Sequence, residues 1–153
     1  MNPKTRLMKN FIFYFFLCFV ATVFAQKKNV SQSIISDDVS IKKYDNKSEL
    51  NRMDKGELLI LYIERIESLV KTLPYIAFTT KPGKTLSSFG IPNSKSNIKA
   101  MKEKEHATFD FIEITSGFQK KMLPYADKNN LISGILFYEE TMRLLHEYNE
   151  IIE

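Results

Sequence analysis

The chain has 153 residues, 26% of them charged, and a formal net charge of +4. Most of this excess lies in the first 25 residues, because 19 basic residues face 18 acidic ones beyond them, and Cys18 is the only cysteine. Because residues 26–153 contain no cysteine, they cannot form disulfides, thiolate metal sites or cysteine nucleophiles. Their nearly balanced charge does not indicate nucleic-acid binding.

The first 25 residues have the pattern of a secretory signal peptide. Three basic residues come first, followed by an apolar run at residues 11–24 and by the small residue Ala25. The run is shorter than the ~20 residues that a transmembrane helix needs. We therefore expect export, to the periplasm or the medium, after cleavage near Ala25, with retention as an uncleaved anchor as the alternative.

Residues 26–53 are polar, with serine, lysine and aspartate dominating and apolar residues only in ones and twos. Such a segment buries too little apolar surface to offset the entropy of ordering it. We expect a polar, disordered tether here, preceding a folded domain at residues 54–153.

The first helix is expected from about Glu57 to Leu73. Asp54 and Glu57 have the spacing of a capping box, and Pro74 lacks the backbone N–H that a continuing helix needs. Apolar residues recur at helical spacing along one arc. They are Leu58, Leu59, Tyr62, Ile63, Ile66, Leu69, Val70 and Leu73.

Residues 75–93 are rich in turn formers, including Pro82-Gly83 and Gly90. The connection is long for a helical bundle, in which a few residues suffice. Apolar residues such as Phe78 and Leu86 are interspersed in it. We expect an ordered loop that folds back onto the domain.

Two further helices are expected after this loop. The second begins after Ser94 or Ser96 and continues to about Thr115, with Ser116-Gly117 as an interruption before a short segment that Pro124 closes. The third follows the turn at 127–130 and runs to the C-terminus. Its apolar surface is so wide that we expect it to be covered on two sides. The predicted fold class is all-α: a small antiparallel three- to four-helix bundle with a long ordered loop, preceded by the signal peptide and the tether.

The residues able to carry chemistry are few. Glu103 and His106 have the Glu-x-x-His spacing of di-iron bundles, and Asp110 and Glu113 continue the stripe, but no second such motif occurs. This stripe points away from most of the apolar residues of its helix, so it predicts a solvated acidic face. His146 is interpreted as a surface histidine. The common enzymatic motifs are absent, so we expect no catalytic residues, no metal and no cofactor.

Charge is unevenly distributed along the domain. Six lysines and one glutamate lie between residues 81 and 104, whereas residues 131–153 hold five glutamates and one arginine. A basic loop with apolar residues nearby favours an acidic partner or an anionic surface. The predicted partner-binding residues are Lys81, Lys84, Phe89, Ile91, Lys95 and Lys99.

The sequence favours a small exported, non-enzymatic protein that acts by protein–protein interaction in the cell envelope, as an adaptor, a chaperone-like binder or an inhibitor/immunity factor. Its expected partner is another envelope or secreted protein; peripheral membrane association and the oligomeric state stay open. One alternative is a carrier of a metal, haem or apolar small molecule held between the first and third helices. Its lining residues would be Tyr62, Phe137, Tyr138 and Met142. The other is an envelope enzyme acting on cell-wall or glycan substrates through Glu103, Asp110 or Glu113.

Overall fold

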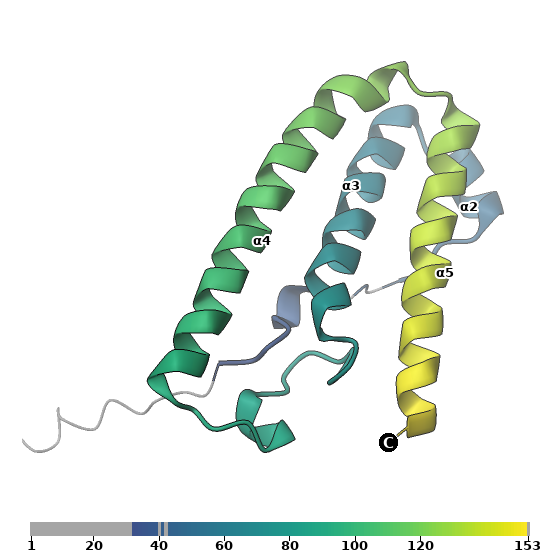
Figure 1. The fold of residues 1–153 in the computed structure, drawn as a ribbon. Coiled ribbons are helices and arrows are strands. Elements are labelled where there is room, and N and C mark those ends of the chain that lie inside the picture. The colour runs from purple at the N-terminus through teal and green to yellow at the C-terminus, as the bar shows by residue number, and fades with distance from the viewer. Residues whose placement is uncertain (1–31, 40, 42, 153) are drawn as a thin grey trace, which may run out of the picture. The chain divides into compact units, whose positions relative to one another are not determined.

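The structure, a computed structural model, describes residues 32–39, 41 and 43–152; the predicted signal peptide lies outside them. Its fold class is all-α, as predicted, with a single isolated β-bridge between Ser33 and Thr85. The helices are α2 (Lys47–Arg52), α3 (Lys55–Thr72), α4 (Lys95–Met122) and α5 (Lys128–Ile152), together with the short 3-10 helices η1 (Asp37–Val39), η2 (Leu73–Tyr75), η3 (Leu86–Phe89) and η4 (Leu123–Tyr125) (Figure 1).

Helix α3 begins and ends where the sequence predicts. The Asp54 side chain accepts a hydrogen bond from the Glu57 backbone, and the Glu57 side chain accepts one from the Asp54 backbone, which completes the capping box. Pro74 lies in η2 and stops the α-helix. Local sequence therefore defines both ends of this helix.

Helix α4 starts after Ser94, whose side chain accepts a hydrogen bond from the Asn97 backbone. The expected interruption at Ser116-Gly117 is wrong, because α4 continues through both residues to Met122. A glycine inside a helix costs only about 1 kcal/mol, and the Ser116 hydroxyl bonds the Glu67 side chain of α3 at 2.8 Å. The predicted separate segment is thus the last part of one long helix.

Part of the predicted tether is ordered in the structure. Asn46 and Glu49 form a capping box that starts α2, and Leu50 of this helix is fully buried. Further towards the N-terminus, Ile34, Ile35 and Val39 are buried as well. Residues 26–31, 40 and 42 lie outside the described residues, so the tether as a whole stays a prediction.

The loop after η2 folds back onto the domain. Leu86 and Phe89 pack with Tyr75 and Met101 against the buried cluster of Ile34, Ile35 and Val39. Two glycines of the loop, Gly83 and Gly90, have positive φ angles that other residues rarely adopt. The long ordered connection is therefore present as expected.

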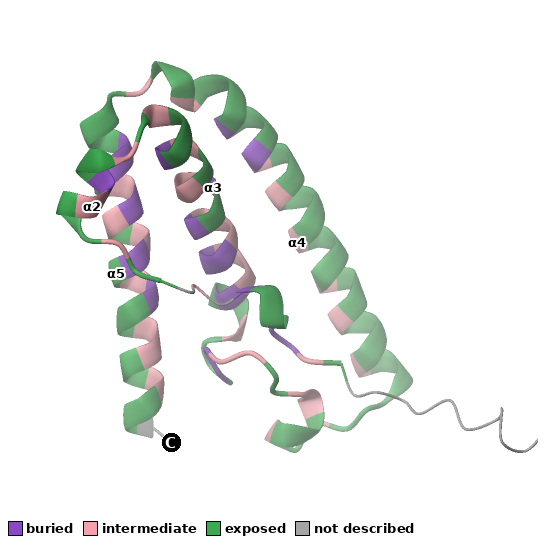
Figure 2. Ribbon diagram, turned by 180° about the vertical axis from the view of Figure 1, so that it is seen from behind, coloured by how far each residue is buried: buried purple, intermediate pink, exposed green. Residues whose placement is uncertain are grey.

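The three long helices are arranged around α3. Helices α3 and α5 run in the same direction and α4 runs in the opposite one, diverging from α3 towards its N-terminal end (Figure 1). Buried residues cluster on α3 and α5, whereas α4 is largely exposed along its length (Figure 2). Among the described residues, no helix combines the length and the apolarity that crossing a membrane requires.

Candidate interaction site

The contacts among the long helices are unequal. Helix α3 packs along α5 and, less extensively, against α4, whereas α4 and α5 barely touch one another in the described part of the chain. In a square four-helix bundle, two helices that both contact a third but not each other occupy diagonal corners. The contacts of α3, α4 and α5 are compatible with a four-helix bundle in which the described residues leave one corner unfilled.

A stripe of large apolar side chains runs along α4, and the described residues leave most of its surface uncovered. Phe111, Ile114, Phe118 and Met122 are separated by steps of three and four residues, so they share one side of the helix, and all four are more than half exposed. The side of α4 that contacts α3 buries only Ser116 and Gln119, and both are polar. The more apolar side of this helix therefore faces outward.

Helix α5 carries a similar stripe on its outer side. Phe137, Leu144, Tyr148 and Ile151 are exposed, and with Thr141 they follow alternating steps of four and three, the spacing of a coiled-coil seam. The expectation that both apolar sides of this helix would be covered is wrong for the single chain. Its inner side alone, with Leu131, Ile135 and Met142, is buried. One helix thus offers two apolar surfaces, and the chain covers one of them.

Both stripes lie on the side of the helices away from the N-terminal segment. Phe109 and Glu139 face that segment, since Phe109 lines a cavity with residues 32–39 and Glu139 accepts a hydrogen bond from the Asp45 backbone. Phe111 and Phe137 are each two residues away, which is a rotation of about 200° around the helix. We call the eight exposed side chains the open face: Phe111, Ile114, Phe118, Met122, Phe137, Leu144, Tyr148 and Ile151.

The floor between the stripes is formed by α3 and its contact with α5. The Tyr62 and Tyr138 hydroxyls are 2.9 Å apart, and their rings meet edge to face. Burial, together with the hydrogen bond to Tyr62, raises the pKa of Tyr138. Tyr62 also lies so close to Gly134 that a Cβ at that glycine would be 2.5 Å from its ring. The floor is therefore tightly packed at Tyr62, Gly134 and Tyr138.

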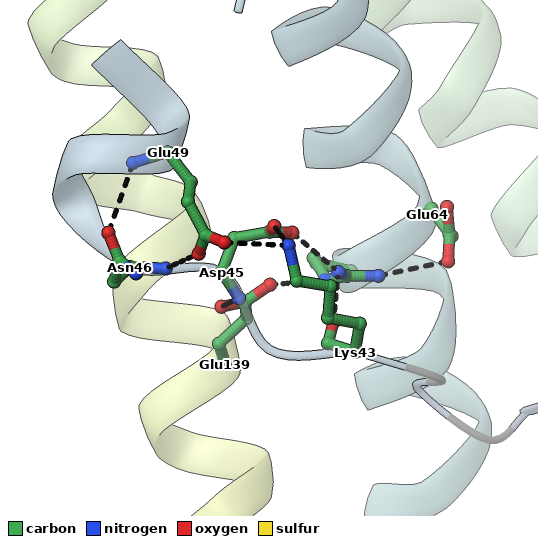
Figure 3. Close-up of polar contacts among 7 residues, drawn as sticks. Lys43, Asp45, Asn46, Glu49, Glu64 and Glu139 are labelled. Carbon is green, nitrogen blue, oxygen red and sulfur yellow. Dashed lines mark hydrogen bonds and ion pairs between the residues drawn. The ribbon is translucent and has the colours of Figure 1, made fainter. Parts of the chain in front are cut away.

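A buried ion-pair cluster holds the opposite side of the molecule together. The Arg65 side chain bonds Glu139 of α5 at 2.7 Å and the Lys43 carbonyl at 2.8 Å, and it lies 3.4 Å from Asp45 (Figure 3). The Asp45 backbone N–H donates to the second oxygen of Glu139 at 2.8 Å. Arg65, Asp45 and Glu139 are nearly completely buried. This cluster fixes α3, α5 and the N-terminal segment to one another, independently of α4.

Of the two histidines, His106 lies on the surface as predicted, whereas His146, predicted to be a surface residue, is half-buried. His106 is exposed, 3.3 Å from Asp110, on the solvated acidic face. His146 is half-buried, and its Nδ1 atom lies 2.9 Å from the Thr80 hydroxyl. Burial lowers the pKa of His146, against the opposing charge of Glu150. Within the described residues, no group of three or more histidine, cysteine, aspartate or glutamate side chains is placed to hold a metal ion.

The predicted partner-binding residues lie at the end of the molecule where α4 begins. Phe89 packs on Phe78 within the loop, and Lys81 lies 3.8 Å from Glu150 of α5. Lys84, Lys95 and Lys99 are exposed, and Ile91 is half-buried. The six predicted partner-binding residues therefore lie together at one end of the molecule and are not part of the open face. Their role in binding a partner stays a prediction.

A cavity of about 780 Å³ lies between residues 32–39, α3 and α4. Ile34, Val39, Phe109 and Ile112 contribute apolar walls. Lys104 also lines it, with its ammonium group 4.3 Å from the centre of the Tyr75 ring, and burial lowers the pKa of this lysine. The carrier hypothesis placed a cavity elsewhere, between α3 and α5, where Tyr62 and Tyr138 bond each other and Met142 is buried.

Comparison of this chain with protein-family models, with curated proteins and with solved structures finds no match.

Proposed function

We propose that the chain is an exported, non-enzymatic helix-binding protein, and that its open face accepts one amphipathic helix of another protein chain as the fourth member of the bundle. One observation carries this proposal. Two apolar stripes, on α4 and α5, flank α3 on the same side and are left largely exposed by the described residues. An amphipathic helix that enters the open corner covers both stripes at once, in the manner of helix-in-groove recognition.

The size of the open face supports an interaction of ordinary strength. A large aromatic side chain offers about 150–250 Å² of surface, so eight residues that are 41–79% exposed together present roughly 900 Å². A standard protein–protein interface buries about 800 Å² on each partner. Monomeric soluble proteins rarely expose contiguous apolar patches larger than a few hundred Å², and those that do use them for binding.

Site-specific photo-crosslinking tests the proposal. The full-length chain would be expressed in the cells that naturally produce it, with p-benzoylphenylalanine in place of Ile114. The control chain would carry p-benzoylphenylalanine in place of Lys102. Both positions are exposed on α4, and twelve residues, a rotation of about 120°, separate them. We expect position 114 to crosslink to a helical segment with an apolar stripe and position 102 not to do so. Equal yields from both positions, or none from either, would overturn the proposal.

A second candidate function is carriage of an apolar small molecule in the cavity between residues 32–39, α3 and α4. The cavity follows α4 from Met101 to Lys120, about 28 Å of helix, so its 780 Å³ form a long and narrow space suited to a single acyl chain. Phe109, which is exposed towards this cavity, would be covered by such a ligand. The Lys104 ammonium, which forms no ion pair with a described residue, would meet a carboxylate head group.

Native mass spectrometry with oleic acid distinguishes this second function. We expect oleate to bind the full-length chain and to be lost from the Ile112→Glu variant, whose side chain lines the cavity. Ile98→Glu is the matched control, because Ile98 lies on α4 outside the lining. Binding that is unchanged in Ile112→Glu, or absent from the parent chain, would remove carriage as a candidate.

A further inference from the structure

We infer that the helix entering the open corner is α4 of a second copy of this chain, in a dimer whose twofold axis runs parallel to the helices. This inference rests on the proposed function and names its partner. In such a dimer each α4 occupies the corner that the other copy leaves open, beside the α4 and α5 stripes of that copy. One rotation then covers the open faces of both copies, which is the self-complementary geometry of an isologous interface.

Helix α4 has the properties that the corner requires. It is 28 residues long, against 25 for α5, so it can span the full length of the stripe that it would cover. Its own apolar side, with Phe111, Ile114 and Phe118, is more than half exposed among the described residues. A second copy therefore covers an α4 stripe that a single-chain arrangement leaves in water.

Charge selects the direction of the second α4. The first part of this helix, residues 95–105, holds four lysines and two glutamates, and the last part of α5, residues 140–150, holds three glutamates and one arginine. An axis parallel to the helices sets α4 of one copy antiparallel to α5 of the other, so these two segments lie side by side. The same axis sets residues 95–105 of the two α4 helices at one level, so the charge argument for this direction rests on the pairing of α4 with α5.

The same axis also sets the register. Rotation about it keeps every residue at its own level, and α4 ends where α5 begins, at one end of the molecule (Figure 1). Counting residues from that end at about 1.5 Å each places Ala107 level with Leu144 of the other copy, and Phe118 level with Ser133. Large side chains thus face small ones at these two levels, and between them Ile114 lies level with Phe137, so two large side chains meet at the centre.

Sedimentation velocity of the full-length protein tests whether the copies associate. We expect a dimer in the parent chain and a weakening of its dissociation constant by roughly 30-fold or more in Ile114→Glu, since central apolar anchors dominate interface energies. Ile60→Glu is the matched control: Ile60 is 71% exposed and Ile114 73%, but Ile60 lies two residues from Tyr62, on the other side of α3. Its dimer should be unchanged. A parent chain that is monomeric at every concentration overturns the inference.

Disulfide trapping tests the register. Ala107→Cys and Leu144→Cys chains, each carrying Cys18→Ala, would be mixed and mildly oxidised; we expect heterodimers. A mixture of Ala107→Cys and Phe137→Cys, whose positions differ by about 10 Å in level, should form far fewer. Equal trapping of both pairs overturns the parallel axis. A monomeric chain whose position 114 photo-crosslinks to a different protein refutes this inference and leaves the proposed function standing, whereas a chain that does neither refutes both.

Discussion

The contact between α3 and α5 and the contact between α3 and α4 are built on different principles. The first buries Leu58, Leu131 and Ile135 completely and adds the Arg65–Glu139 ion pair at 2.7 Å. The second is sparse, and the residues that α4 buries in it are Ser116 and Gln119. Helix α4 thus contacts α3 through polar residues, and its exposed apolar residues are not covered by other side chains of the described part of the chain. The comparison indicates that α3 and α5 form a self-sufficient pair, and it is the basis of our proposal that another chain completes α4.

The largest effect is expected at the buried ion pair. Arg65→Met leaves the buried Glu139 carboxylate without its cation, whereas Asp45 keeps Lys43 at 3.1 Å, and breaking a buried pair costs about 3–5 kcal/mol. Urea denaturation should show this loss in the free energy of unfolding, and the double variant Arg65→Met/Glu139→Leu should recover part of it. Arg143→Met, at an exposed ion pair on α5, should change little. Equal effects at both arginines would contradict the special role of the cluster.

Two glycines sharpen the comparison between the helices. Gly134→Ala would set its Cβ 2.5 Å from the Tyr62 ring, and such overpacking costs about 1–3 kcal/mol despite the better helix propensity of alanine. Gly117 of α4 has open space around it, so Gly117→Ala should stabilise the chain by about 0.5–1 kcal/mol. Thermal unfolding measures both. If the two variants shift the midpoint in the same direction, α5 does not pack on α3 more tightly than α4 does.

The polar contact of α4 can be improved by substitution. The Gln119 side-chain oxygen is buried and has no hydrogen-bond partner among the described residues. Gln119→Leu removes this unsatisfied group and should raise the free energy of unfolding by about 1 kcal/mol. Gln32→Leu, at an exposed hydrogen bond to Glu105, serves as the control and should have no such effect. A destabilised Gln119→Leu variant would show that the α3–α4 contact depends on this amide.

The smallest effect concerns pH. Burial lowers the pKa of His146 below its usual value of 6.5, so the unfolded chain takes up a proton at a higher pH than the folded chain does. The contribution of His146 to the free energy of unfolding should therefore be constant above about pH 7. It should fall as the pH drops below that value and the unfolded chain becomes protonated. His146→Gln should reduce the fall between pH 7 and pH 5. An unchanged pH profile would show that burial does not disfavour the imidazolium form of His146.

Much of the fold could be predicted from the sequence because local signals define it. The Asp54 capping box, Ser94 and the two prolines at 74 and 124 act on the backbone next to them, and the structure places helix ends there. Helix α2 was missed although Asn46 and Glu49 have the same capping spacing, because only six residues follow and their apolar content is low.

The candidate site was harder to predict because it depends on which surfaces meet. A stripe such as Phe137, Leu144 and Tyr148 predicts that something covers the helix, but the spacing does not say whether the cover belongs to the same chain. Arg65 carries no local sign of burial either, since its partners Asp45 and Glu139 lie 20 and 74 residues away. Long-range pairing of this kind becomes visible only in the folded arrangement.

Hydroxyl-radical footprinting of α4 tests the central claim most directly. Phe109 and Phe118 are 64% and 62% exposed in the single chain and point to opposite sides of the same helix. If another chain fills the open corner, Phe118 should be protected in the native assembly while Phe109 is oxidised, and Ile114→Glu should make the two rings equally reactive. Equal oxidation of Phe109 and Phe118 in the parent protein would show that nothing covers the open face.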